Sequence, residues 1–328
     1  MGAVGHGWRA GRALLALSLV LLAGCGPGRS PQGGGAGSRL TVLTTVLPIT
    51  LFTRAVAGDC AEVRALIPPG SGPHDFQARP SDLAALGRAQ VLVRNGLGLE
   101  AFLDRFLATA DLPRLRVIDS SAGIATIRSS GADHGHAGHG GHDHAGDRPG
   151  EPNPHIWLDP LRAIRQVETI RDGLVAADPA CADRYRRNAA RTVASLQRLD
   201  ADVAAALRPY RGKTFVALHD IAPYFAQRYG LRAESLVDVP EANPSPADLQ
   251  RVAGIVRRSQ LRALLSEPQA SAGSFNALAR DLGIRVSEFD GLETGSTAME
   301  DSASAGDPGA YLSVMRTNVS RLRQAFGG

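Results

Sequence analysis

The sequence predicts an α/β protein with two lobes, each a four-stranded parallel sheet flanked by helices, and one long helix joining them. Three observations predict this fold. Short runs rich in Val, Leu and Ile alternate with helical runs, a pattern typical of parallel βαβ units. Four strand-like runs precede the middle of the chain and four follow it. A long helical stretch without internal Gly or Pro separates the two sets.

The first four strand-like runs place the N-terminal lobe at residues 39–179. Turn residues bound each run, and the expected strands cover 40–47, 63–67, 91–95 and 115–120. Helical patterns fall between them at 48–58, 80–89 and 100–110. This order of elements predicts that the four strands form one parallel sheet.

The second set of runs places the C-terminal lobe at residues 211–328. The expected strands cover 214–219, 233–239, 261–267 and 284–290. The expected helices cover 223–230, 245–260 and 273–283. Residues 180–210, between the lobes, are expected to form one rod of about 46 Å at 1.5 Å per residue. Such a rod is a stiffer connector than a pair of flexible strands.

The N-terminus predicts export and a lipid anchor. Residues 1–24 combine Arg9 and Arg12 with a short apolar run, as in a signal peptide. The run ends in small residues followed by Cys25, which resembles a bacterial lipobox and makes Cys25 the expected site of lipidation. Residues 25–38 are rich in Gly and Ser and are expected to form a flexible tether. We therefore expect a body held at the extracytoplasmic face of the cell membrane.

Charge and cysteine content narrow the function classes. The 36 basic and 32 acidic residues give a formal net charge of only +4, so no nucleic-acid partner is expected. The chain has three cysteines, which excludes a disulfide-dense scaffold. Cys60 and Cys181, the two that remain after Cys25, are a candidate disulfide because the expected location is oxidising.

Five of the nine histidines cluster in the insert DHGHAGHGGHDH at residues 133–144. Its Gly-rich composition predicts a solvated loop that cannot pack into a core. The loop histidines are candidate auxiliary metal ligands, and the alternative is a tolerated insertion without a role. They are His134, His136, His139, His142 and His144.

Three other histidines point to a metal site between the lobes. His74 lies in a Gly/Pro-rich loop, His155 precedes an expected helix, and His219 ends the fifth expected strand. Asp290 ends the eighth strand. Because parallel α/β sheets bind ligands beyond the carboxyl ends of their strands, these four side chains could meet in one cleft. Three imidazoles and a carboxylate suit zinc, and four protein ligands favour binding over catalysis.

Eight motifs in order give the chain a family resemblance over about residues 40–326. They are G-x-x-P-H-x-F around His74, NGLGLE, N-P-H-I-W-L-D-P around His155, YRRNA, H-D-x-x-x-Y-F-x-x-x-Y-G-L from His219, NPSP, E-P-Q from Glu267 and Y-L-x-x-M-R-x-N. Together they resemble the zinc- and manganese-binding lipoproteins that serve as substrate-binding proteins of bacterial ABC importers. No single motif is decisive, but the ordered set is specific.

The resemblance implies a monomer that captures Zn²⁺ between two lobes and delivers it to an ABC permease and its ATPase. It places metal ligands at His74, His155, His219 and Asp290. A third histidine and a histidine-rich loop are similar to the zinc subgroup, because manganese members tend to have a carboxylate in the third position. Glu267 is expected to orient a ligand histidine or to cap a loop, and Trp157 is expected to pack.

The sequence does not single out one residue as the fourth metal ligand. The stretch SEFDGLETG lacks the Asp-Pro-Leu-Gly that is usual in the family, so Glu288, Glu293 or the segment 294–308, expected to be flexible, are alternatives to Asp290, as is water. Other functions are capture of manganese or iron, a zinc hydrolase with an open fourth position, and a surface adhesin. The sequence contains no HExxH and no G-x-S-x-G motif to support a hydrolase, so no enzyme is expected. It also lacks the repeats and the exposed apolar pattern that would support an adhesin.

Overall fold

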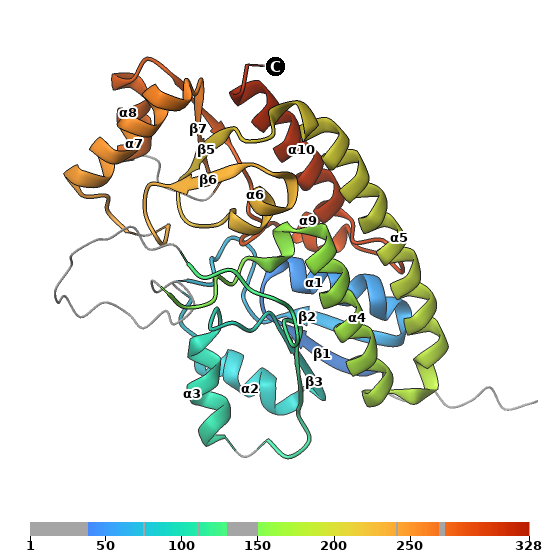
Figure 1. Cartoon of the computed structure of the whole chain (residues 1–328). Coiled ribbons are helices and arrows are strands. Elements are labelled where there is room, and N and C mark those ends of the chain that lie inside the picture. The colour runs from blue at the N-terminus through green and yellow to red at the C-terminus, as the bar shows by residue number, and fades with distance from the viewer. Residues whose placement is uncertain are drawn as a thin grey trace, which may run out of the picture. The chain divides into compact units, whose positions relative to one another are not determined.

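The computed structural model describes residues 39–74, 76–110, 112–129, 150–240, 242–268 and 273–327. The described residues belong to one compact unit, Arg39–Gly328. This unit (Figure 1) holds both sheets and both hydrophobic cores, so it carries the elements needed to fold without residues 1–38. The expected signal peptide, Cys25, the tether and the histidine-rich loop lie outside the described residues.

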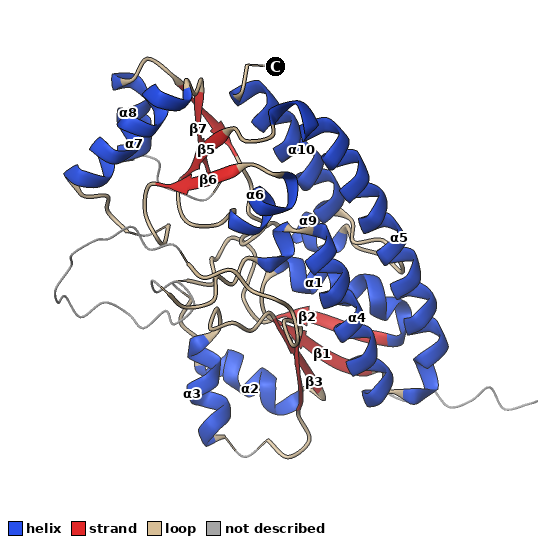
Figure 2. Ribbon diagram, viewed as in Figure 1, coloured by secondary structure: helices blue, strands red, loops and turns tan. Residues whose placement is uncertain are grey.

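The first lobe is a parallel sheet with helices on both faces. Its strands are β1 (Leu40–Thr44), β2 (Ala61–Ala65), β3 (Val91–Arg94) and β4 (Arg116–Asp119), in the order β2-β1-β3-β4. Its first helices are α1 (Leu47–Ala57), α2 (Pro80–Arg88) and α3 (Ala101–Thr109). Side chains alternate along β1: Val42 joins the main core with α1, and Leu43 joins a smaller core with α2 and α3. Figure 2 shows these layers.

The second lobe repeats this topology. Its strands are β5 (Thr214–Ala217), β6 (Arg232–Ser235), β7 (Ala263–Ser266) and β8 (Arg285–Glu288), all parallel and ordered β6-β5-β7-β8. Its helices are α6 (Pro223–Tyr229), α7 (Pro246–Ser259) and α8 (Gly273–Asp281). The predicted fold of two four-stranded parallel sheets is therefore confirmed. In each sheet the strand order reverses between the first and third strands, where α/β folds bind their ligands.

A long helix joins the lobes as predicted. Helix α5 (Ala182–Leu207) follows α4 (Pro160–Ala177) and is extended by 3₁₀ turns at Pro179–Cys181 and Arg208–Tyr210. It packs against α1, α4, α6 and α10 (Ala310–Ala325). Its buried positions recur every three or four residues, as a one-sided helix requires. They include Tyr185, Ala189, Leu196, Leu199, Val203 and Leu207.

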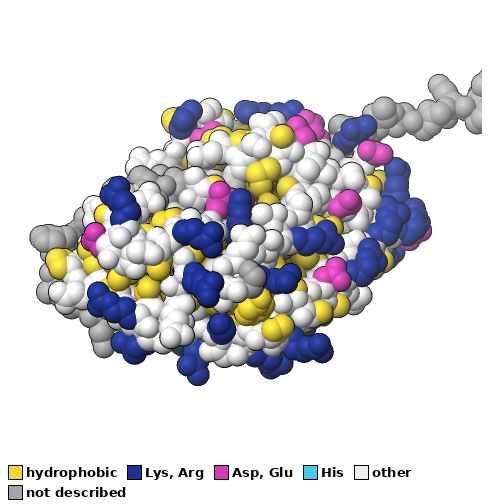
Figure 3. Space-filling model, turned by 90° about the horizontal axis from the view of Figure 1, so that it is seen from above, with side chains coloured by type: hydrophobic (Ala, Val, Ile, Leu, Met, Phe, Trp, Pro, Cys, Tyr) yellow, Lys and Arg dark blue, Asp and Glu magenta, His cyan; other side chains and the backbone are white. Residues whose placement is uncertain are grey.

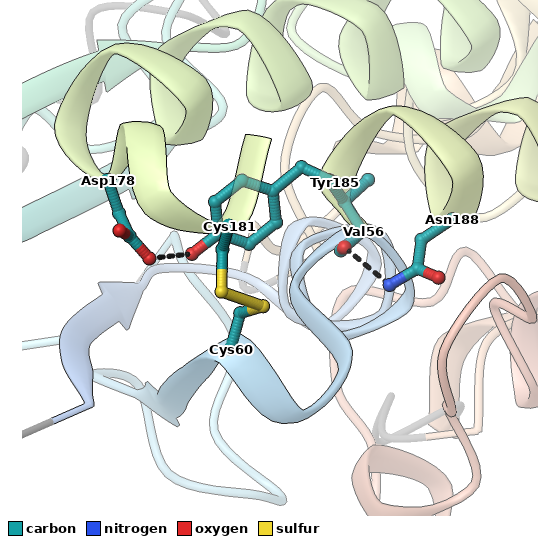
Figure 4. Close-up of a disulfide and its surroundings, with 6 residues drawn as sticks. All are labelled: Val56, Cys60, Asp178, Cys181, Tyr185 and Asn188. Atoms are coloured by element: carbon teal, nitrogen blue, oxygen red, sulfur yellow. Dashed lines mark hydrogen bonds between the residues drawn. A yellow bond between two sulfur atoms is a disulfide. The ribbon is translucent and has the colours of Figure 1, made fainter. Parts of the chain in front are cut away.

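A disulfide fastens the start of α5 to the first lobe. Cys60 and Cys181 are bonded, with their Cα atoms 6.2 Å apart and a sequence separation of 121 (Figure 4). Two hydrogen bonds flank the bridge: the Tyr185 hydroxyl donates to Asp178 at 2.9 Å, and the Asn188 amide donates to the Val56 carbonyl at 3.0 Å. The connector is thus held covalently as well as by packing.

Two of the differences between the described elements and the expected ones have clear local causes. The strand expected at 40–47 ends at Thr44, because α1 begins at Leu47 with a proline in its first turn. The segment 294–308, expected to be flexible, contains α9 (Thr297–Asp301), whose Ser296 cap accepts the Met299 amide. Within the described chain, no helix is both long and apolar enough to cross a bilayer.

Candidate metal centre

The three predicted histidines converge on one buried point from different segments. His74 comes from the loop between β2 and α2, His155 precedes the 3₁₀ turn that leads into α4, and His219 lies just beyond β5. The fourth member of the group is Glu293, in the loop after β8. One ligand atom from each of the four lies within 4.8 Å of the other three. All four side chains are buried, the most exposed at 3%.

The candidate ligand atoms are the Nε2 atoms of the histidines and the carboxylate oxygens of Glu293. Glu293 Oε1 lies 2.6 Å from His74 Nε2 and 3.0 Å from His155 Nε2. Glu293 Oε2 lies 3.5 Å from His219 Nε2, which is 3.4 Å from His155 Nε2. Four candidate ligand atoms, contributed by both lobes, therefore face one small volume. Tetrahedral coordination of a cation needs such an arrangement.

Neighbouring acceptors orient two of the imidazoles. His155 Nδ1 donates to Asn153 Oδ1 at 3.0 Å, and His219 Nδ1 donates to Glu267 Oε1 at 2.5 Å. A histidine that donates through Nδ1 presents the Nε2 lone pair to a metal, and such partners raise the basicity of the ring. The contact of Glu267 with His219 is the one expected of a residue that orients this imidazole, and its effect on metal binding stays a prediction.

The electrostatics of the group are dominated by its carboxylates. Burial alone would lower the pKa of His219, but Glu267 and Glu293 outweigh it and raise the pKa to about 9. Burial alone would raise the pKa of Glu293, but the imidazoles of His74, His219 and His155 hold that pKa well below its usual range. The two buried carboxylates, Glu267 and Glu293, carry a charge of −2 when ionised, which the +2 of one divalent cation would balance.

Asp290 does not join the group, and Glu293 takes the place expected for it. The Asp290 side chain is engaged locally, where Oδ1 accepts the Leu292 amide at 2.7 Å. The chain then turns through Leu292, which has a φ of +62°, and delivers the longer Glu293 side chain to the histidines. An Asp-Gly pair is typical of such turns. The DGLE stretch was therefore the signal that favoured Glu293 over Asp290.

Direct hydrogen bonds also tie the two halves of the site together. The Trp157 indole donates to the Gly291 carbonyl at 2.8 Å, so Trp157 packs as expected and also holds the loop of Glu293. On the other side, the Tyr224 hydroxyl donates to the Asn153 carbonyl at 2.7 Å. The His155 segment is thus bonded to two segments of the second lobe, so separating the lobes would break these contacts as well as the ligand geometry.

Known proteins share this chain's sequence pattern and fold. The family model described as ZnuA, zinc-uptake complex component A periplasmic, matches residues 42–325. The zinc-binding lipoprotein AdcA of Streptococcus pneumoniae is 31% identical over 314 residues, which covers 95% of this chain and 60% of that relative. The high-affinity zinc uptake system protein ZnuA of Bacillus subtilis is 27% identical over 319 residues, which covers 95% of this chain and 96% of the relative.

A solved structure shows the same likeness. The Zn(II)-bound ZnuA-like domain of Streptococcus pneumoniae AdcA superposes with a TM-score of 0.72 at 28% identity, covering 88% of this chain and all of that domain. The chain spans 60% of the length of the pneumococcal AdcA relative. The match to the family model extends over most of the chain and includes every residue of the histidine and glutamate group. The chain therefore belongs to the family of the periplasmic zinc-uptake complex component A.

Proposed function

We propose that this protein captures Zn²⁺ outside the cytoplasm and delivers it to an ABC permease that an ATPase drives. The observation that carries the proposal is the convergence of three histidine Nε2 atoms and the Glu293 carboxylate within 4.8 Å, in a fully buried site. We assign His74, His155, His219 and Glu293 as the ligands. Zinc is the transported substrate here, not a resident cofactor.

The donor set favours zinc over manganese or iron. Three imidazole nitrogens and one carboxylate match the tetrahedral nitrogen-rich sites of zinc, whereas manganese prefers oxygen ligands and higher coordination. The charge supports a divalent ion, because the −2 of Glu267 and Glu293 is neutralised on binding. Four protein ligands leave no position for an activated water, which argues against the hydrolase alternative.

The N-terminal predictions extend this proposal to the cell envelope. We propose that Cys25 is lipidated and that residues 25–38 tether a monomeric body to the membrane. Relatives named as lipoproteins support this assignment. Replacement of Cys25 with Ser should release the protein from the membrane fraction. Unchanged fractionation would contradict the anchor without touching the zinc site.

Metal competition tests the central proposal. The protein would be stripped, offered equimolar Zn²⁺ and Mn²⁺, dialysed, and its metal counted. We expect one tightly held zinc in the wild type and none in His219→Ala. A variant lacking residues 133–144 is the matched control, because the loop histidines are proposed only as weak auxiliary sites and its tight zinc should remain. Preference for manganese, or a tight zinc that survives His219→Ala, would overturn the proposal.

A further inference from the structure

A row of basic side chains crosses one end of the second lobe. Each strand of the second sheet begins there, and each beginning carries one exposed basic residue. In sheet order they are Arg232, Lys213, Arg262 and Arg285. Backbone hydrogen bonds of 2.9 Å from Arg232 to Lys213 and 3.1 Å from Arg285 to Arg262 hold neighbours side by side. At about 4.8 Å per strand this basic row spans about 15 Å.

Helix ends add further basic residues around the row. Because the helices of βαβ units run back against their strands, α7, α8 and α10 end where the strands begin. Their last turns carry Arg257, Arg280 and Arg323, all exposed. Figure 3 views the body from this end and shows Lys and Arg spread across the face, with few acidic side chains among them.

Local electrostatics explain only part of this concentration. Cations at helix C-termini complement the helix dipole, which accounts for the three helix-end arginines. The amino-terminal end of a sheet has no comparable dipole, so the basic row obtains no such dipole stabilisation. None of its four side chains forms an ion pair with any residue in the described part of the chain. Lys213 Nζ donates to the Phe326 carbonyl at 3.5 Å and lies 5.7 Å from the centre of the Phe326 ring, so the row is exposed positive charge without an acidic partner among the described residues.

We propose that the basic row, with the helix-end arginines beside it, docks on an anionic phospholipid surface. Its charges lie at the amino-terminal ends of four neighbouring strands and at the adjacent helix ends. This layout suits a plane of lipid phosphates. Basic residues near an anionic bilayer strengthen binding by about fivefold each. A lipid chain together with a basic patch gives the two attachments that stable anchoring requires.

The length of the chain allows this contact. Leu40 pairs with Ala61, next to Cys60, and the disulfide places that point beside Cys181 at the start of α5. The basic row lies beyond the other end of α5, whose 26 residues span about 39 Å. Residues 26–38 can extend to about 45 Å, so a membrane anchor at Cys25 leaves the row within reach of the same bilayer. The inference uses the membrane location proposed above but not the zinc site.

Vesicle binding tests the proposal. Residues 39–328, the unit that holds both sheets and both cores, would be mixed with two kinds of vesicle. One is phosphatidylcholine alone, and in the other about a third of the lipid is phosphatidylglycerol. Binding to each would be measured at about 0.05 M and about 0.5 M salt. We expect binding only to the anionic vesicles and only at low salt. Replacing Lys213, Arg232, Arg262 and Arg285 with Gln should weaken it by about 600-fold.

A matched variant separates the row from net charge. Arg88, Arg114, Arg184 and Arg187 are exposed arginines elsewhere on the body, and changing them to Gln removes the same total charge. This variant should bind anionic vesicles within about threefold of wild type. Equal weakening by both variants, no binding to anionic vesicles, or retention on a polyphosphate matrix without vesicle binding would each overturn the proposal. Zinc titration of the same samples checks folding and tests the metal site separately.

Discussion

Replacing Glu293 with Gln gives the sharpest test of the metal centre. The change keeps the shape of the side chain but removes the carboxylate charge that lies 2.6 Å from His74 Nε2 and 3.0 Å from His155 Nε2. The zinc complex would then hold one buried carboxylate, Glu267, against two positive charges. Leaving a buried charge uncompensated costs about 3–5 kcal/mol. Zinc affinity should therefore fall roughly 150- to 5,000-fold.

Asp290→Asn is the matched control. It also removes one carboxylate from the loop after β8, but Asn keeps an oxygen that can accept the Leu292 amide, the bond made at 2.7 Å. Because Asp290 shapes the turn and is not part of the histidine group, we expect zinc affinity within about threefold of wild type. A threefold change corresponds to less free energy than one ordinary hydrogen bond contributes.

Competition with a fluorescent zinc chelator, run at one pH, measures both affinities, and the melting temperature of the metal-free protein reports any folding defect. If Asp290→Asn abolished tight binding while Glu293→Gln kept it, Asp290 would be the ligand and the assignment of Glu293 would be wrong. If both variants bound zinc like wild type, neither carboxylate would be a ligand and water would remain as the fourth donor.

Three further predictions follow from the same contacts. Glu267→Gln should weaken zinc binding about 10- to 100-fold, because it removes the charge that supports His219; an unchanged affinity in the chelator assay would count against that role. Since His219 has its pKa raised to about 9, zinc must displace its proton at neutral pH, so apparent affinity should rise with pH up to that value and fall in acid; a flat titration profile would contradict this. Replacing Cys60 and Cys181 with Ser opens a loop of 121 residues and should lower the free energy of unfolding by about 5 kcal/mol in denaturant titrations; a loss under about 1 kcal/mol would show that packing alone fixes α5.

The sequence was most informative where local pattern and topology coincide. Runs such as LTVLT and ALLS are short, apolar and bounded by turns, so they predict parallel strands without knowledge of their partners. The alternation of such runs with helices then limits the sheet to few topologies. Glu267 directly follows β7, and His219 lies just beyond the end of β5. These strands flank the point where strand order reverses, so the position of both residues at the site could be anticipated.

The sequence by itself determined the two sheets, the connecting helix and the three histidines, because these depend on short-range periodicity and on residue types that suit zinc. Only the tertiary structure shows that Glu293, and not Asp290, lies beside the three histidines. Asp290 and Glu293 are three residues apart and chemically alike. Their roles are set by contacts that are remote in sequence: the Asp290 amide donates to Asn318, 28 residues away, and Gly291 accepts from Trp157, 134 residues away. Those bonds turn the loop so that Glu293 meets the imidazoles, and no local pattern encodes them.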